Sequence, residues 1–275
     1  MRFKVVCSDI DGTLLNQDRQ LSPKTIETIR DLPRHVPVVL ASSRMPAAMR
    51  HLQEELGILH HPLICYNGSY ILHFDEAGTQ AEVLFSKVIE AGLCKQLVVL
   101  GEQHGIHVSL YRADEWYVPA LDQWADREQN NTKVKPEVAD LHGVVEVWEN
   151  ESSGAHKVMC MGDPEGIDQI VEALADSGLN MYRSKPTYLE IADGSMNKAT
   201  ALELLLQSKF DHSLADVIAF GDNYNDIELL TAAGIGVAVG NAKEEVKLIA
   251  NDITDPGKED GVATAIEKWR AGGLG

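Results

Sequence analysis

Short apolar segments that end in acidic or glycine-containing turns alternate with helical segments at both ends of this sequence. Near the start these segments are Phe3–Ser8, Val36–Ala41 and Leu63–Tyr66, and near the end they are Val217–Phe220 and Gly236–Val239. Segments with helical spacing lie between them. Because strands that alternate with helices form parallel sheets covered on both faces, the sequence predicts an α/β, Rossmann-like doubly wound core.

The middle of the chain has a different pattern, in which hairpins and helices follow one another without regular alternation. A hairpin is indicated around residues 70–85, and Gly143–Trp148 is predicted as a strand. This mixture is typical of an α+β insert. We therefore expect a discontinuous catalytic core, residues 1–83 and 190–275, with an inserted α+β cap domain at residues 84–189.

The chain is strongly acidic, with 42 Asp and Glu against 24 Lys and Arg in 275 residues and a formal net charge of −18. Such a chain repels nucleic acid and anionic lipid at long range. No apolar stretch approaches the ~20 residues of a membrane span. The cysteines lie far apart and form no CxxC pair, which is typical of a reducing cytosol. We expect a cytoplasmic protein that binds neither nucleic acid nor membrane.

Two acidic turns directly follow predicted strands. The first turn, with the sequence DIDGT at residues 9–13, follows the first predicted strand and contains Asp9, Asp11 and Gly12. The second, with the sequence GDNYND at residues 221–226, follows the predicted strand Val217–Phe220. Ligands of open α/β sheets bind beyond the carboxyl ends of the strands, where these carboxylates would gather. An oxygen-rich, sulfur-free set of ligands suits Mg²⁺. Asp and Gly are also common in ordinary turns, but two such turns in one α/β frame favour a site.

A hydroxyl group and a lysine complete the candidate site. Ser42 follows the second predicted strand, where a hydroxyl can donate to a phosphate oxygen or simply cap a helix. Lys198 lies at the start of a predicted helix, where the macrodipole disfavours a cation, so a functional role competes with that of an ordinary surface lysine.

Taken together and in this order, these motifs resemble those of the haloacid dehalogenase superfamily, in its Cof-type branch with a type IIB cap. The matching segments are DIDGTLL at 9–15, SSR at 42–44, Lys198 and GDNYND at 221–226, with NGSYI at 67–71, LEI at 189–191 and GNA at 240–242. Ser42 replaces the more usual threonine and Ser43 the usual glycine.

This resemblance implies a magnesium-dependent phosphatase that acts through an aspartyl-phosphate. Asp9 would be the nucleophile and Asp11 the general acid and base. Mg²⁺ would bind the Asp9 and Asp222 carboxylates and the Asp11 backbone carbonyl, with Asp226 supporting the metal shell. Ser42 and Lys198 would hold the phosphoryl oxygens. Further groups would bind phosphate or orient neighbours (Gly12, Thr13, Ser43, Arg44, Asn225, Asn241) or contact substrate (Asn67, Lys157, Arg183, Glu190).

Three matters stay open at the level of sequence. A phosphomutase or phosphotransferase of the same superfamily and a non-enzymatic, phospho-accepting receiver-like protein are the alternatives to a phosphatase. The expected substrate is a small phosphorylated metabolite, chiefly a sugar phosphate, and the oligomeric state cannot be read. The pairs His60–His61 and His104…His107 lack a third metal ligand, so surface or capping roles are expected for them.

Overall fold

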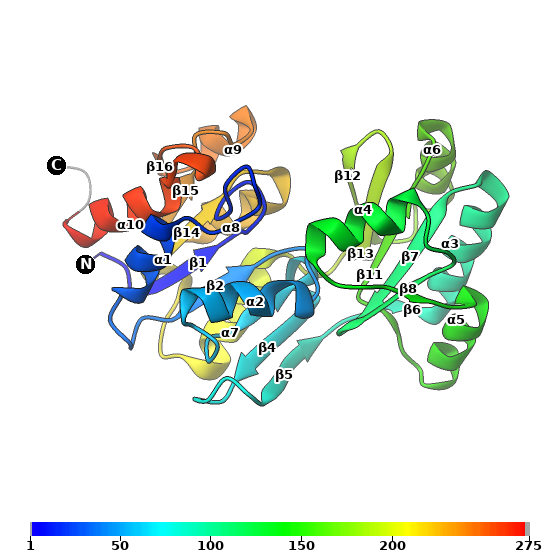
Figure 1. The fold of residues 1–275 in the computed structure, drawn as a ribbon, viewed down its shortest axis with the longest axis horizontal. Coiled ribbons are helices and arrows are strands. Elements are labelled where there is room, and N and C mark those ends of the chain that lie inside the picture. The colour runs from blue at the N-terminus through cyan, green and yellow to red at the C-terminus, as the bar shows by residue number, and fades with distance from the viewer. Residues whose placement is uncertain (1, 273–275) are drawn as a thin grey trace. The chain divides into compact units, whose positions relative to one another are not determined.

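The computed structural model describes residues 2–272, which form two compact units (Figure 1). The first unit contains residues 2–44, 49–85 and 196–272. The second contains Met45–Ala48 and Ser86–Ser195. Its C-terminal limit lies beyond residue 189, where the predicted insert ends, because β13 (Tyr188–Asp193) pairs within the sheet of the second unit.

The first unit is built on an eight-stranded sheet with the order β16-β15-β14-β1-β2-β3-β4-β5. The strands from β16 to β3 are parallel, and β4 runs antiparallel to β3. Their bounds are β1 Val5–Ser8, β2 Val38–Ala41, β3 Leu63–Cys65, β4 Tyr70–Phe74, β5 Ala81–Ser86, β14 Val217–Gly221, β15 Ile235–Ala238 and β16 Asp252–Ile253.

Helices cover both faces of this sheet. Strands β2 and β3 lie on one side of β1, and strands β14 and β15 lie on its other side. Because crossover connections between parallel strands are right-handed, the helices that connect the strands of these two halves lie on opposite faces of the sheet. Helix α1 packs on α10, and α7 packs on α8 (Figure 1). The bounds are α1 Pro23–Arg30, α2 Ala47–Leu56, α7 Lys198–Lys209, α8 Ile227–Ala232, α9 Glu244–Ile249 and α10 Gly261–Arg270.

Local signals explain why these helices begin where they do. Ser22 caps α1 by accepting a hydrogen bond from the Thr25 amide at 3.0 Å, and Pro23 occupies the first turn. Asn197 and Thr200 form a reciprocal capping box at the start of α7. The central strands are buried on both faces, which is why they read as continuous apolar runs.

The second unit contains a six-stranded sheet with the order β12-β13-β11-β7-β8-β9 and a two-stranded β10-β6 pair. Helices α3, α5 and α6 pack on one sheet face around an apolar core that includes Leu110, Trp148 and Ile191. The bounds are β6 Ile89–Glu90, α3 Ala91–His104, β7 His107–Arg112, β8 Glu115–Val118, α4 Gln123–Thr132, β9 Glu137–Val138, α5 Leu141–Asn150, β10 Gly154–Ala155, β11 Lys157–Met161, α6 Pro164–Ala173 and β12 Leu179–Lys185.

The predicted strand Gly143–Trp148 is wrong, because this segment lies inside helix α5. Its β-branched run VVEV favours a strand locally. In the structure Asp140 caps the helix by accepting from the His142 amide at 3.1 Å. Leu141, Val145 and Trp148, at helical spacing, are then buried in the core of the unit. Tertiary packing and the cap outweigh the local β propensity.

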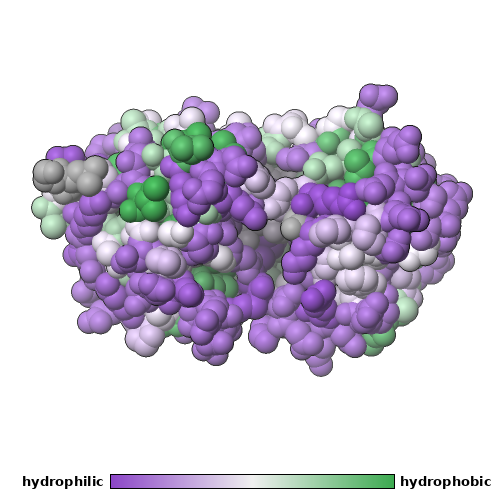
Figure 2. All heavy atoms as spheres, turned by 90° about the horizontal axis from the view of Figure 1, so that it is seen from above, coloured by the Kyte–Doolittle hydropathy of each residue, from purple (hydrophilic) through white to green (hydrophobic). Residues whose placement is uncertain are grey.

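The outer surface agrees with the acidic composition. On the face drawn in Figure 2, hydrophilic side chains predominate and apolar residues form small separate groups. Among the residues that the structure describes, no helix has the length and apolarity needed to cross a bilayer.

Candidate active site

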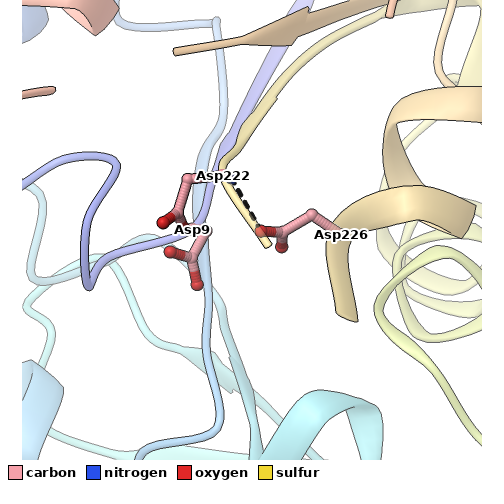
Figure 3. Close-up of side chains that lie close together, drawn as sticks. All are labelled: Asp9, Asp222 and Asp226. Atoms are coloured by element: carbon pink, nitrogen blue, oxygen red, sulfur yellow. Dashed lines mark hydrogen bonds between the residues drawn. The ribbon is translucent and has the colours of Figure 1, made fainter. Parts of the chain in front are cut away.

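Three carboxylates gather at the carboxyl ends of two neighbouring strands. Asp9 follows β1 and Asp222 follows β14, and these strands pair in parallel with Ser8 opposite Phe220. Asp226 lies in the next turn of the chain, a 3₁₀ helix over Tyr224–Asp226. Asp9, Asp222 and Asp226 each offer one oxygen, and these oxygens lie within 4.8 Å of one another (Figure 3).

Lys198 ties two of these carboxylates together. Its Nζ donates to Asp9 Oδ1 at 2.6 Å and to Asp226 Oδ1 at 2.7 Å, and both Lys198 and Asp226 are fully buried. The other Asp226 oxygen accepts from the backbone amides of Asp222 and Asn223 at 3.0 and 3.1 Å. Asp226 therefore has partners on both oxygens. Among residues 2–272, no side chain or amide donates to Asp9 Oδ2, which leaves that oxygen available.

The net negative charge of this cluster favours the binding of a further cation. Burial raises the pKa of Asp9 to about 8 and that of Asp222 to about 6, and the neighbouring Asp226 charge adds to both shifts. Burial disfavours the charged form of Lys198, but Asp226 and Asp9 raise its pKa above the usual value. Three carboxylates and one ammonium give a net charge of −2 when all are ionised. An oxygen-only ligand set with this charge fits a divalent metal ion.

The loop after β1 fits closely against Asp222. Gly12 has φ +86°, and a Cβ there would lie 2.5 Å from Asp222 Oδ2, so only glycine is accommodated. Thr13 Oγ1 donates to Asp222 Oδ1 at 3.2 Å. Asn241 Nδ2 donates to the Gly12 carbonyl at 2.8 Å and Asn241 Oδ1 accepts from the Gly257 amide at 2.8 Å. The predicted orienting residues Thr13 and Asn241 thus hold this loop and Asp222 in place.

Asp11 is held by two arginines. Arg44 Nε and Nη2 donate to its two carboxylate oxygens at 2.7 and 2.8 Å, and Arg19 Nη2 donates at 2.6 Å. Burial alone would raise the pKa of Asp11, but the hydrogen bond and charge of Arg44, with the charge of Arg19, hold it below the usual value. The sequence did not single out Arg19. The only local feature of the sequence that could have indicated its role is its position in the polar loop that follows the first acidic motif.

The remaining predicted groups of the first unit lie at the same strand ends. Ser42 directly follows β2, is buried, and accepts from the Arg44 amide at 3.3 Å, while Ser43 is half-buried. Asn225 Nδ2 donates to Asn67 Oδ1 at 3.0 Å, which joins the turn after β14 to the turn after β3. Asn67 has φ 55°, a left-handed conformation that asparagine tolerates.

The predicted substrate residues of the second unit have different surroundings. Lys157 Nζ lies 3.9 Å from Glu190 Oε2 and 4.6 Å from the centroid of the Tyr111 ring, and both charged side chains are largely buried. Arg183 is exposed, pairs with Asp168 and donates to the Pro186 carbonyl at 2.6 Å. These contacts tie Arg183 to α6 and to the turn after β12.

Two of the histidines for which surface or capping roles are expected, His61 and His107, are buried. His107 lies between Asp122 Oδ2 at 2.8 Å and Ser109 Oγ at 2.9 Å, and His61 Nδ1 accepts from the Val38 amide at 2.7 Å. Both have hydrogen-bond partners within one unit of the fold, and among the described residues neither belongs to a cluster of three metal-ligating side chains.

Comparison with known proteins agrees with this geometry. Residues 6–266 match the haloacid dehalogenase-like hydrolase family. A 5-amino-6-(5-phospho-D-ribitylamino)uracil phosphatase of Bacillus subtilis is 29% identical over 96% of this chain and 97% of its own length. A pyridoxal phosphate phosphatase of Escherichia coli is 28% identical over 97% and 98%. The crystal structure of a haloacid dehalogenase-like hydrolase from Bacteroides thetaiotaomicron superimposes with a TM-score of 0.87 at 28% identity, covering 97% of this chain and 99% of that one. The chain therefore belongs to the haloacid dehalogenase-like hydrolases, among relatives that are phosphatases.

Proposed function

We propose that this phosphatase transfers the phosphoryl group of a small phosphorylated metabolite to Asp9 and then to water, with Mg²⁺ as its cofactor. The observation that carries this proposal is the state of Asp9, whose Oδ1 is fixed by Lys198 at 2.6 Å while Oδ2 accepts no hydrogen bond from residues 2–272. A carboxylate held by one oxygen and open at the other is suited to attack an electrophile.

Positioned charge supports the transfer. Phosphoryl transfer passes through a loose transition state, so a weak nucleophile suffices when the oxygens of the phosphoryl group are neutralised. Lys198 and Ser42 would contact those oxygens, and Lys198 already lies beside the nucleophile. Mg²⁺, when bound by Asp9, Asp222 and the Asp11 carbonyl, would supply further charge neutralisation. Asp226 would hold Lys198 and the 222–223 amides in place.

Asp11 would donate a proton to the leaving oxygen and later take one from the attacking water. In the arrangement described, its carboxylate is ionised and bound by Arg44 and Arg19, which suits the second task, the removal of a proton from water. The first task requires a protonated Asp11, and hence a looser contact with these arginines. We expect that contact to loosen when substrate phosphate competes for the guanidinium groups.

The substrate proposal rests on the relatives and on the second unit. One relative is named for a phosphorylated ribityl compound and another for pyridoxal phosphate, both small phosphate esters. We propose small phosphorylated metabolites, chiefly sugar or sugar-alcohol phosphates, with Lys157 and Glu190 contributing to their selection. A hydroxyl-rich substrate suits a buried cation and carboxylate that can both form hydrogen bonds. The four cysteines are free and buried, which supports a reducing cytoplasmic setting.

The decisive experiment traps the phosphorylated enzyme. A ³²P-labelled sugar phosphate is mixed with excess protein and quenched in acid, and protein-bound label that hydroxylamine releases identifies an acyl phosphate. Asp9→Asn should abolish this label and lower kcat by more than ~100-fold, worth roughly 2.7 kcal/mol. The control Asp18→Asn changes an exposed aspartate nine residues away and should keep both. Label that persists in Asp9→Asn would exclude Asp9 as the nucleophile.

The same labelled protein separates a phosphatase from a phosphomutase. A phosphatase releases its label as inorganic phosphate at a rate that added sugar phosphate leaves unchanged. A phosphomutase instead passes the label to an added sugar phosphate faster than to water. Transfer as the main route would replace the hydrolytic assignment with the alternative one.

A further inference from the structure

The two arginines that contact Asp11 differ in exposure and in the number of their contacts. Arg44 has a side chain that is 6% exposed, and it donates from two nitrogens, one to each carboxylate oxygen of Asp11. The side chain of Arg19 is 43% exposed and donates from one nitrogen, to Asp11 Oδ1 at 2.6 Å. Because Arg44 by itself holds both oxygens, the contact of Arg19 is not needed to orient Asp11.

The backbone of the loop at residues 16–20 is held by its own hydrogen bonds. Asn16 Oδ1 accepts from the amides of Asp18 and Gln20 at 2.9 and 3.0 Å. The Asn16 carbonyl accepts from the Arg19 amide at 3.0 Å, and the Asn16 amide donates to the Gln20 carbonyl at 2.9 Å. Since the backbone is fixed in this way, Arg19 can change its partner by rotation of its side chain alone.

Arg19 has a backbone conformation that favours glycine or asparagine. Its φ is +58°, in the left-handed region, where a Cβ lies close to the following carbonyl oxygen. Glycine avoids this contact, so the stability of the loop does not explain an arginine at this position. Backbone strain of this kind is concentrated at functional sites, where a side chain is needed in one place. A function of the guanidinium group therefore accounts for the residue better than a role in the loop.

The exposure of Arg19 also makes it accessible to an anionic substrate. Lys198, which contacts two carboxylates of the site, is fully buried, and Arg44 is nearly so. Of these three cations, Arg19 is the one that solvent reaches. The chain carries a net charge of −18, so local cations must attract an anion. A guanidinium group suits this task, because it can donate two parallel hydrogen bonds to a phosphate group.

We propose that Arg19 is a substrate-binding residue, which leaves Asp11 Oδ1 and donates to the phosphate group of the incoming substrate while Arg44 stays on Asp11. This role rests on the proposed function, in which Asp11 lies within hydrogen-bond distance of the leaving oxygen. Arg19 Nη2, 2.6 Å from Asp11, then lies within about 6 Å of that oxygen, which rotation of the side chain can cover. Substrate binding thereby removes one of the two donors from Asp11 Oδ1.

Binding of inorganic phosphate tests this role without turnover. The full chain with Mg²⁺ is titrated with phosphate in a calorimeter. Arg19→Gln should weaken phosphate binding at least ~5-fold, or ~1 kcal/mol. Arg34→Gln removes the same charge from an exposed arginine outside the site and should leave the affinity unchanged. Equal affinity of Arg19→Gln and the parent would overturn the inference, and so would equal losses in the two variants. The label that hydroxylamine releases tests the Asp9 chemistry separately.

Steady-state kinetics distinguish substrate binding from a positioning role for Arg19. In Arg19→Gln, KM for a sugar phosphate should rise at least ~5-fold while kcat changes less than ~2-fold. Arg19→Lys keeps the charge and should restore part of the affinity. A loss confined to kcat would show that Arg19 only positions Asp11, and it would overturn the proposal.

Arg19→Gly separates the side chain from the strain of its backbone. Glycine suits the left-handed conformation, so the midpoint of thermal unfolding should equal or exceed that of the parent. Phosphate affinity should nevertheless fall as far as in Arg19→Gln, because the guanidinium group is absent. An Arg19→Gly protein that binds phosphate as tightly as the parent would overturn the assignment of Arg19 to substrate binding.

Discussion

Each of the two units buries a lysine near carboxylate oxygens, and the two arrangements differ in how closely the charges approach. In the first unit, Lys198 Nζ lies 2.6 Å from Asp9 Oδ1 and 2.7 Å from Asp226 Oδ1. In the second, Lys157 Nζ lies 3.9 Å from Glu190 Oε2 and above the Tyr111 ring. Short charge-assisted hydrogen bonds fix an ammonium group in place, whereas a longer ion pair over a ring face does so less strictly.

This difference matches two different tasks. Charge stabilisation in a transition state requires groups that are already positioned, because reorganisation during the reaction is costly. Recognition of one of several related substrates requires polar groups that adjust to the ligand. We therefore propose that Lys198 acts in the chemical step and Lys157 in substrate selection, and the following predictions test that contrast.

The largest effect is expected for Lys198→Met. The substitution leaves Asp9 and the fully buried Asp226 without their cation, and breaking a buried pair in this way costs about 3–5 kcal/mol of stability. Chemical denaturation measures this loss, and kcat should fall by at least ~10³-fold, or roughly 4 kcal/mol. Lys209→Met, at the exposed end of the same helix, removes an ion pair to Glu82 and should cost less than ~1 kcal/mol. Equal losses in the two variants would contradict the assigned role of Lys198.

The next effect concerns the metal. Asp222→Asn keeps the shape beside Gly12 and Thr13 but removes one negative charge from the cluster. The Mg²⁺ concentration for half-maximal activity should rise at least tenfold, or ~1.4 kcal/mol. Asp211→Asn, an exposed aspartate outside the cluster, is the matched control. Full activity of the parent protein after exhaustive chelation would exclude a metal requirement.

A smaller effect should appear in the pH dependence of stability in the absence of metal. Because the pKa of Asp9 is raised to about 8 in the folded protein, the folded state binds more protons than the unfolded state between the two pKa values. The free energy of unfolding should therefore decrease from pH 6.5 to 8, by on the order of 1 kcal/mol. His61 and His156, whose pKa values are lowered from 6.5 to about 4, act mainly between these two values, and they oppose the decrease only at the lower edge of the window. Asp9→Asn should flatten the decrease, and saturating Mg²⁺ should abolish it. A parent protein whose stability is constant over this range without metal would refute the raised pKa.

The smallest effect is expected for Lys157→Met. The longer contact with Glu190 predicts a stability loss of about 1–2 kcal/mol, below that of Lys198→Met. If Lys157 selects substrate, KM for sugar phosphates should rise severalfold while kcat changes less than twofold. Lys185→Met, an exposed lysine in β12, should change neither constant. A loss confined to kcat would move Lys157 into the chemical step and remove the contrast between the two lysines.

The extent to which sequence predicted the fold differs between the two units. The strands and helices of the first unit carry strong local signals, such as continuous apolar runs and the caps Ser22 and Asn197. In the second unit the sequence wrongly predicted a strand at Gly143–Trp148, and it did not identify α4 (Gln123–Thr132), which is mostly polar. Short β-branched runs fit helix or strand equally well, and only packing decides between them.

The sequence by itself determined which chemical groups follow which strands, because a turn at the end of a buried run is a local property. It thereby placed Asp9, Asp222 and Ser42 at one edge of a parallel sheet. Only the tertiary structure decided that Lys198 contacts Asp9 across 189 residues of chain, and that Arg19 joins Arg44 on Asp11. It also decided that His61 is buried and accepts a hydrogen bond from the Val38 amide. Desolvation and charge interactions depend on distances through space, which neighbouring residues in the chain do not specify.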